Sequence, residues 1–229
     1  MLRLYPLNTR LHWLRLVTHV GAWIPLAWLL WAVSTGNLTV NPIQAATQYS
    51  GKDALVFLVL SLAVTPIHTL TGYRPVLKVR RALGLYAFFY ALVHVFIFTV
   101  IDYGLDWGLL QGAIFEKTYI LVGLATLIIL TSLAVTSFKW WMKRMGKRWT
   151  RLHRLIYLAG LLVILHFAWS LKGNLFSLQG DITQPLAFGL AVVLLLAARI
   201  PRLRRWISNQ RSRLLHRRPT AGLRQQRAV

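Results

Sequence analysis

Apolar runs of membrane length recur along the whole chain, and they restrict its possible folds more than any other feature. A helix rises about 1.5 Å per residue, so about 20 apolar residues cross the roughly 30 Å of hydrocarbon in a bilayer. Lipid offers no partner for unpaired backbone groups, so each run must be helical. The sequence therefore predicts an all-α, polytopic membrane protein, a bundle of six transmembrane helices. The six runs are residues 13–34, 54–71, 82–101, 118–137, 154–171 and 185–200.

Basic residues alternate between the loops. Of the 27 Lys and Arg residues, 24 lie in four segments at or beyond the ends of the runs, residues 1–15, 72–81, 138–154 and 199–229. Basic loops stay in the cytoplasm, so we expect both termini there. Topology and anionic lipid thereby account for the net charge of +22, and nucleic acid is not an expected partner. The acidic residues fall in the other loops or at the ends of runs: Asp53, Asp102, Asp106, Glu116 and Asp181.

The runs fill most of the chain and leave little room for a second domain. We expect one transmembrane domain, residues 1–205, and a basic cytoplasmic tail, residues 206–229, with an interfacial helix after Pro201. The loop 102–117 is either a short amphipathic helix or plain loop. No small-residue cleavage pattern follows the first run, so we expect that run to be retained. The tail is too short for a flavin or nicotinamide domain, and no GxGxxG or Walker motif occurs.

Two histidines lie deep inside apolar runs. His94 is seven residues before the outer end of the third run, and His166 is six residues before Lys172 at the end of the fifth. Both are thus expected about 10 Å below the outer surface. A buried imidazole indicates function by default, and two facing imidazoles can ligate a haem iron from both sides. The simpler alternative is a pair of buried histidines bonded to backbone groups.

The chain has no cysteine, so structural disulfides, CxxCH haem attachment and cysteine-ligated iron–sulfur clusters are excluded. Any haem is then a haem b, held by histidine alone. Small residues near the pair are expected to let a flat macrocycle approach, and aromatic residues to pack its faces. The small residues are Ala87, Ala91, Ala159 and Gly160, and the aromatic ones are Phe88, Phe89, Phe96, Phe167 and Trp169.

A second, inner cofactor is left open by the sequence. His153 lies 13 residues before His166, about 20 Å nearer the cytoplasm but about 140° away on a straight helix, unless a bulge near Gly160 realigns it. The corresponding position of the third run holds Arg80, followed by Arg81. Neither arginine is an ordinary iron ligand, but either can pair with a propionate or a phosphate.

Further histidines are expected at the inner side. His12, His19 and His68, with Arg15, Arg80 and Arg81, either line a pocket for a quinol headgroup, a flavin phosphate or a second haem, or act as interfacial anchors. His216 lies in the tail and is expected to be solvated.

Four segments resemble a specific family: SGKDAL at 50–55, VTP at 64–66, RRALGLY at 80–86, and LHRLIYL…LHFAWSLK within 152–172. The chain is similar, over roughly residues 10 to 205, to the membrane haem-binding subunit of the bacterial periplasmic protein-methionine-sulfoxide reductase system. That family lies within the ferric-reductase-like transmembrane superfamily. His94, His153 and His166 match the family's histidines. The superfamily usually has two histidines on each of two helices, and Arg80 stands here where the fourth is expected.

The resemblance implies an electron-transfer subunit in the bacterial inner membrane rather than a catalytic subunit. Electrons would come from membrane quinol or from a cytosolic flavin reductase, and would pass to a periplasmic molybdenum-cofactor reductase that repairs oxidised methionines. The family is also associated with FMN, for which no motif here gives a position. The alternatives are a stand-alone ferric or cupric reductase, a histidine-based metal or proton transporter, and a structural membrane anchor. A transporter would be expected to place carboxylates beside its intramembrane histidines.

Overall fold

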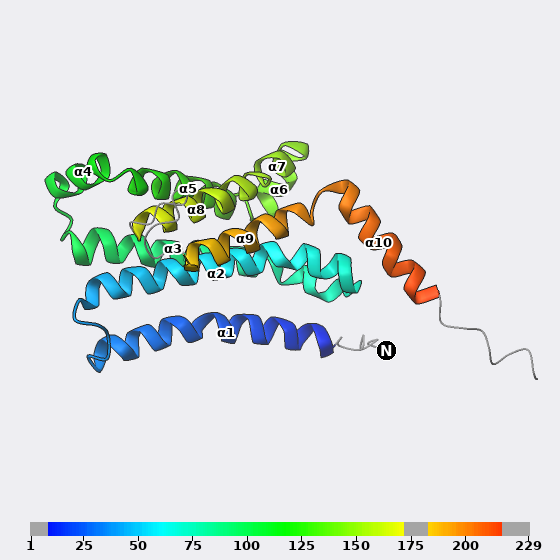
Figure 1. The fold of residues 1–229 in the computed structure, drawn as a ribbon, viewed down its shortest axis with the longest axis horizontal. Helices are drawn as coiled ribbons and strands as arrows, with labels where there is room; N and C mark the ends of the chain where they lie inside the picture. Colours follow the sequence, from blue (N-terminus) through cyan, green and yellow to red (C-terminus); the bar gives the residue numbers. More distant parts are fainter. Residues whose placement is uncertain (1–8, 172–182, 217–229) are drawn as a thin grey trace, which may run out of the picture.

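The computed structural model describes residues 9–171 and 183–216, and every regular element within these ranges is helical. The long helices lie side by side in one bundle, and the last helix leaves it at one end (Figure 1). The all-α prediction is thus confirmed for the described residues. The elements are α1 (Thr9–Ser34), α2 (Pro42–Thr71), η1 (Arg74–Lys78), α3 (Arg80–Phe96), η2 (Ile97–Asp102), α4 (Trp107–Glu116), α5 (Thr118–Val135), α6 (Lys139–Met145), α7 (Lys147–Leu152), α8 (Leu155–Ser170), α9 (Thr183–Ala197) and α10 (Pro201–His216).

Within the described residues, five helical segments are long and apolar enough to cross a membrane, so the chain is a multi-pass membrane protein. A sixth span requires α9 and the start of α10 together, and these two bend by 80° at their junction. At 15 residues, α9 alone rises only about 22 Å. Its predicted start at 185 is close to the observed Thr183. The prediction of six spans therefore holds only if α9 and the start of α10 are counted as one span.

The second helix begins at Pro42, about three turns before the predicted position 54. Its start is set by a cap, because the Asn41 side chain accepts a hydrogen bond from the Gln44 N–H and Pro42 occupies the first turn. Polar residues in these turns lowered the hydropathy and hid the helix. Lys52 and Asp53 therefore lie inside α2, and the prediction that every acidic residue is in a loop or at the end of a span was wrong for Asp53.

Two other segments differ from a simple reading of hydropathy. The loop 102–117, which the sequence left undecided, contains helix α4. Helix α10 forms after Pro201 as expected and crosses the proposed domain boundary at 205.

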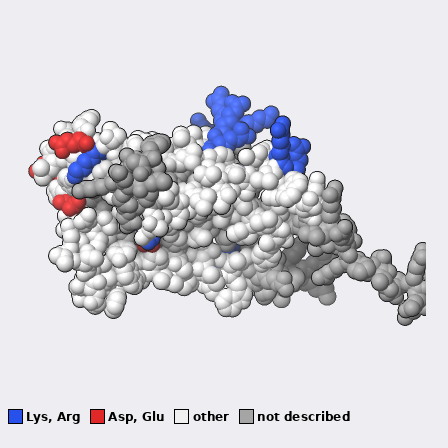
Figure 2. Space-filling view, viewed as in Figure 1, with Lys and Arg blue, Asp and Glu red and all other residues white. Residues whose placement is uncertain are grey.

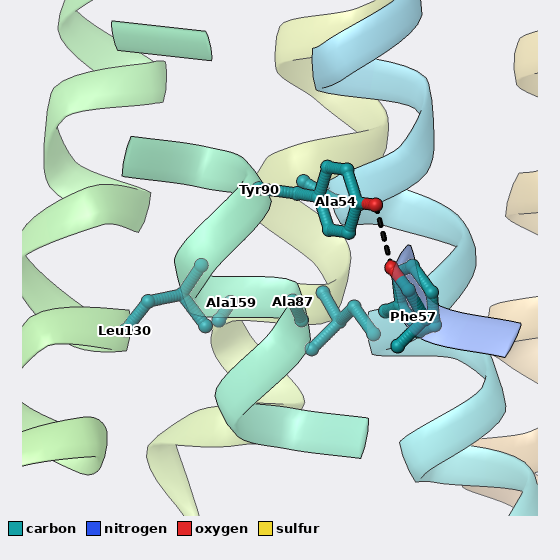
Figure 3. Packing of buried hydrophobic residues seen from close by; sticks show 8 residues of the cluster. Ala54, Phe57, Ala87, Tyr90, Leu130 and Ala159 are labelled. Carbon is teal, nitrogen blue, oxygen red and sulfur yellow. Dashed lines mark hydrogen bonds between the residues drawn. The ribbon is translucent and has the colours of Figure 1, made fainter. Parts of the chain in front are cut away.

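The core lies where α1, α2, α3, α5 and α8 meet, and Figure 3 shows part of it. Ala87 and Ala159 are fully buried there, beside Tyr90 and Phe57, whose rings stack with centroids 5.2 Å apart. Gly160 lies within contact of Leu62 and Val192. Apolar burial does not drive helices together in lipid, so small residues that allow close packing hold such a bundle. Ala87, Ala159 and Gly160, which are expected from the sequence to lie near a macrocycle, take part in this close packing.

Two prolines interrupt long helices, and side chains repair both interruptions. Beside Pro25 in α1, the Tyr90 hydroxyl accepts from the Leu26 N–H at 3.1 Å and donates to the Ala22 carbonyl at 2.6 Å, the bond drawn in Figure 3. Pro66 in α2 has no N–H for the Leu62 carbonyl, and Arg199 donates its Nη2 to that oxygen at 2.8 Å. Lipid cannot satisfy such groups, so these contacts tie α3 to α1 and α9 to α2.

Charge separates along the bundle (Figure 2). Acidic residues gather at the end that carries α4, whereas lysines and arginines cover α6 and α7 at the other end. This arrangement agrees with the predicted orientation, in which α6 and α7 are cytoplasmic. The orientation itself stays a prediction.

Candidate functional site

His94 and His166 lie side by side in the half of the bundle nearer α4. His94 comes from the last turn of α3 and His166 from α8, and their ring centroids are 6.1 Å apart with the rings nearly perpendicular at 88°. The sequence placed the two imidazoles at one depth, and the structure brings them together.

Each imidazole is held by a backbone carbonyl from a neighbouring helix. Nδ1 of His94 bonds to the Thr47 carbonyl at 2.8 Å, and Nδ1 of His166 bonds to the Tyr119 carbonyl at 2.7 Å. A carbonyl oxygen only accepts, so Nδ1 carries the proton in both rings. Nε2 of each neutral ring is then the unprotonated nitrogen, available to a metal. The sequence also allowed two buried histidines that only bond to backbone groups. Those backbone bonds are present, and they leave Nε2 of each ring available to a metal.

Two glycines, which the sequence analysis missed, let the rings reach these carbonyls. A Cβ atom at Gly51 would lie 2.9 Å from Nδ1 of His94, and one at Gly123 would lie 2.7 Å from Nδ1 of His166. Contacts this short are not tolerated by real Cβ atoms, so only glycine fits at either position. Each glycine is four residues after the accepting carbonyl, one turn further along the same helix.

The two half-sites are copies of one arrangement. Gly51 precedes His94 by 43 residues, and Gly123 precedes His166 by the same number. The pentapeptide SLAVT also occurs twice, at 61–65 in α2 and at 132–136 across the end of α5. The pair α2 and α3 therefore corresponds to the pair α5 and α8. This repeat was present in the sequence, and it is the signal that identifies both glycines.

The repeat also relates Arg80 to His153, toward the other end of the bundle. Nε2 of His153 lies 3.2 Å from the Thr136 hydroxyl, which donates its own proton to the Ser132 carbonyl at 2.6 Å, so Nε2 is the donor to Thr136. Nη1 of Arg80 donates to the Thr65 hydroxyl at 3.4 Å. Both threonines end an SLAVT segment. Arg80 thus holds in the first copy the place that His153 holds in the second. The structure therefore places an arginine where a fourth histidine is usual.

His153 is not aligned with His166 by a bulge near Gly160. The helix breaks instead at His153 and Arg154, between α7 and α8, and Gly160 is an ordinary helical residue. The His153 ring stacks on Trp149 with centroids 4.0 Å apart. His153 and Arg80 therefore form an inner layer separate from the outer pair. Arg81 is exposed.

The structure describes the side chains of two further histidines, His19 and His68. Nδ1 of His19 bonds to the Tyr86 hydroxyl at 2.8 Å. His68 lies in the last turn of α2. The side chains of His12 and His216 lie outside the described residues. Among the residues that the structure describes, no three His, Asp or Glu side chains gather as a metal site, so a metal at the pair would need its other ligands from a bound group.

The predicted aromatic neighbours are used mainly between helices. Phe89 packs edge-on against Trp23, and Phe167 packs edge-on against Phe188. Phe96 is 55% exposed at the bundle surface. Tyr119, which the sequence analysis did not select, has its ring 5.9 Å from that of His166.

A helical membrane bundle that presents one histidine from each of two helices defines a class of transmembrane redox protein, and comparison with known families agrees. Residues 50–165 match the model described as the ferric reductase like transmembrane component, so the chain belongs to that class.

Curated relatives specify the family more narrowly. Three proteins named protein-methionine-sulfoxide reductase heme-binding subunit MsrQ are similar to this chain. The one from Bordetella pertussis is 39% identical over 79% of this chain and 85% of its own length. Those from Rhodospirillum rubrum and Cronobacter sakazakii are 40% and 34% identical, over 83% and 85% of this chain and 89% and 94% of their own lengths. The chain belongs to the MsrQ family, which confirms the resemblance drawn from its motifs.

Proposed function

We propose that the chain is a haem b electron-transfer subunit in which His94 and His166 would hold the haem iron. The observation that carries the proposal is the distance between the rings. Two imidazoles that bind one metal ion through bonds of about 2 Å, with roughly 1 Å from each nitrogen to its ring centre, can have centroids about 6 Å apart. The observed 6.1 Å fits this arrangement. The names of the relatives, heme-binding subunits, support it.

The surroundings of the pair suit an axial role. The carbonyls of Thr47 and Tyr119 fix the protonated nitrogen of each ring and so leave Nε2 unprotonated in both. Such bonds raise the basicity of a ligand and help set the potential of the iron. The bound haem supplies a one-electron carrier in the part of the membrane that a bare electron cannot cross. The chain's own contribution is to hold two neutral imidazoles in hydrocarbon.

The position of the pair suggests the direction of transfer. His94 lies in the last turn of α3, and His166 bonds to Tyr119 at the start of α5, next to α4. From the positive-inside rule we expect this end of the bundle at the outer side. We propose that electrons enter at the inner side from membrane quinol, or from a cytosolic flavin reductase, and leave toward a periplasmic molybdenum-cofactor methionine-sulfoxide reductase. The relatives' name, a subunit of protein-methionine-sulfoxide reductase, supports this partner. The proposed location is the bacterial inner membrane.

The inner layer is the candidate site for a second cofactor. His153 has one nitrogen bonded to Thr136 and keeps the other, Nδ1, for a metal. Arg80 and Arg81 are assigned to propionate or phosphate groups at this level. The repeat supports a role for Arg80 beside His153, because the two residues hold corresponding positions in the two copies. The inner layer thus offers one histidine for a metal and one arginine for an acidic group.

The haem content of purified variants tests the proposal. His94→Ala and His166→Ala should each abolish the outer haem, because one imidazole alone leaves the iron without its second ligand. His153→Ala should retain at least that haem. The measurement is the haem-to-protein ratio with the reduced-minus-oxidised spectrum. Wild-type protein without haem would refute the function, and equal, complete loss in all three variants would refute the outer pair.

A further inference from the structure

A sharp elbow joins α9 to α10 at the basic end of the bundle. The two helices bend by 80° across residues 198–200, and α10 turns away from the bundle (Figure 1). A helix that leaves a membrane span at this angle runs along the surface of the bilayer rather than through it. Ile200 and Trp206 expose 52% and 60% of their surfaces at this elbow, as expected for side chains that meet acyl chains at an interface.

Arg199 in the elbow connects it to the bundle. One guanidinium nitrogen bonds to the Leu62 carbonyl of α2, and another donates to the Tyr157 hydroxyl of α8 at 3.3 Å. The guanidinium carbon also lies 5.3 Å from the centre of the Tyr157 ring. Nε of Arg199 is buried and has no hydrogen-bond partner within the described part of the chain. Arg199 therefore has one buried N–H group without an acceptor, although its two other guanidinium nitrogens are hydrogen-bonded.

The elbow also encloses a positively charged hollow. A cavity of about 360 Å³ is lined by Arg199, Pro201, Arg204 and Arg205. No acidic residue of the described ranges lines it. Arg80 lies close enough to Arg199 for the two guanidinium groups to repel each other. Three arginines around one hollow, with a fourth nearby, create a site that lacks a negative partner among the residues the structure describes.

We propose that this hollow binds the phosphate headgroup of an anionic phospholipid from the adjacent leaflet. Arginine presents a planar set of donors that suits phosphate oxygens, and basic pockets between transmembrane helices bind anionic headgroups. The exposed Ile200 and Trp206 place the hollow at the interface, where such a headgroup lies. This site is separate from the histidine pair and does not depend on the haem assignment.

Lipid in the hollow would stabilise the junction between α9 and α10. Arg199 bonds this junction to α2 and α8. A bound phosphate compensates the repulsion among the arginines and so fixes the junction. The expected consequence is a protein whose thermal stability depends on anionic lipid.

The test compares two double variants that lose the same charge on the same side of the bundle. Arg204→Gln/Arg205→Gln removes two exposed residues of the hollow, and Lys139→Gln/Lys143→Gln removes two exposed lysines of α6. Full-length protein is purified in mixed micelles of detergent and phosphatidylcholine, with and without phosphatidylglycerol. Phosphatidylglycerol should raise the unfolding midpoint of wild type and of the α6 variant by about 2–4 °C, and this shift should disappear in the arginine variant.

Native mass spectrometry supplies the second measurement. Wild type and the α6 variant should retain a bound phosphatidylglycerol molecule that the arginine variant loses, while haem absorbance stays equal in all three. Equal lipid responses in both variants, or equal responses to phosphatidylcholine and phosphatidylglycerol, would overturn the proposal. Saturable binding of flavin mononucleotide that needs Arg204 and Arg205, without any lipid response, would also overturn it by assigning the hollow to a soluble phosphate ligand.

Discussion

Backbone atoms and glycines, rather than further side chains, position the two histidines. Each imidazole donates to a carbonyl one helical turn before a glycine, and each glycine leaves room that any side chain would fill. Such a support costs little, because it adds no polar side chain to the hydrocarbon. It also locks the tautomer that leaves Nε2 free, so the chemistry of the site depends on residues with no functional group.

Replacing either glycine by alanine should therefore damage the site without weakening the helix. Gly51→Ala and Gly123→Ala are expected to displace the imidazole and to lower haem affinity by about 10- to 100-fold, the usual effect of losing a supporting contact to a ligand. The measurement is haem retention during titration with a competing apo-haemoprotein, with the reduced spectrum. Gly21→Ala is the matched control, because a Cβ there meets nothing within 4 Å. Unchanged haem affinity in both site variants would show that the rings do not need these contacts.

The depth of the two histidines could be predicted from the sequence. The carbonyls and glycines that support their rings could not be found by counting residues along one helix. Depth in the membrane follows from spacing along a single helix, so His94 and His166 could be matched by counting residues. Which turn of α2 faces His94 depends on how α2 and α3 pack, and hydropathy contains no such information. Only comparison of the two halves of the chain, where glycine and histidine recur at one separation, would have shown the supports.

Prolines shape the bundle at the scale of the helix. Pro66 removes the donor for the Leu62 carbonyl, and the chain replaces it with Arg199 from the turn after α9, 137 residues beyond Leu62. The proline of the VTP segment thus creates the free carbonyl that this arginine binds. This partner was not predictable from the sequence, since a proline in a span indicates a kink but not the side chain that repairs it. The start of α2 was hidden for a different reason, because its polar first turns have low hydropathy.

The contact between Arg199 and α2 predicts a specific dependence on Pro66. Arg199→Met leaves the Leu62 carbonyl without a donor and should lower the free energy of unfolding by about 1–3 kcal/mol. In a Pro66→Ala background the new N–H can bond to that carbonyl, so the same change should cost about 1–2 kcal/mol less. Unfolding in mixed micelles measures both values. Pro25→Ala in α1 is the control and should be additive with Arg199→Met, because its region is bonded to Tyr90 instead. Additivity in both backgrounds would contradict the repair.

At the scale of the whole molecule, two copies of a helix pair build a site that neither copy holds alone. The outer layer keeps the copies alike, with one histidine, one carbonyl and one glycine from each. The inner layer makes them different, with Arg80 in one and His153 in the other. The two ends of the bundle also differ in charge. Acidic residues gather near α4, on the side of the outer layer, and basic residues gather near α6 and α7, on the side of the inner layer (Figure 2). Both asymmetries lie along the path proposed for the electron.

The orientation of this path can be measured directly, because the chain contains no cysteine. We predict that α4 faces the periplasm and α6 the cytoplasm, since most lysines and arginines fall on the α6 side. Gln111→Cys in α4 and Lys143→Cys in α6 each introduce a single thiol at an exposed position. A membrane-impermeant maleimide added to cells with a permeabilised outer membrane should label the first and leave the second unlabelled until the inner membrane is opened. The reverse pattern would place the histidine pair toward the cytoplasm, and electron delivery to a periplasmic reductase would then have to start from the other end of the bundle.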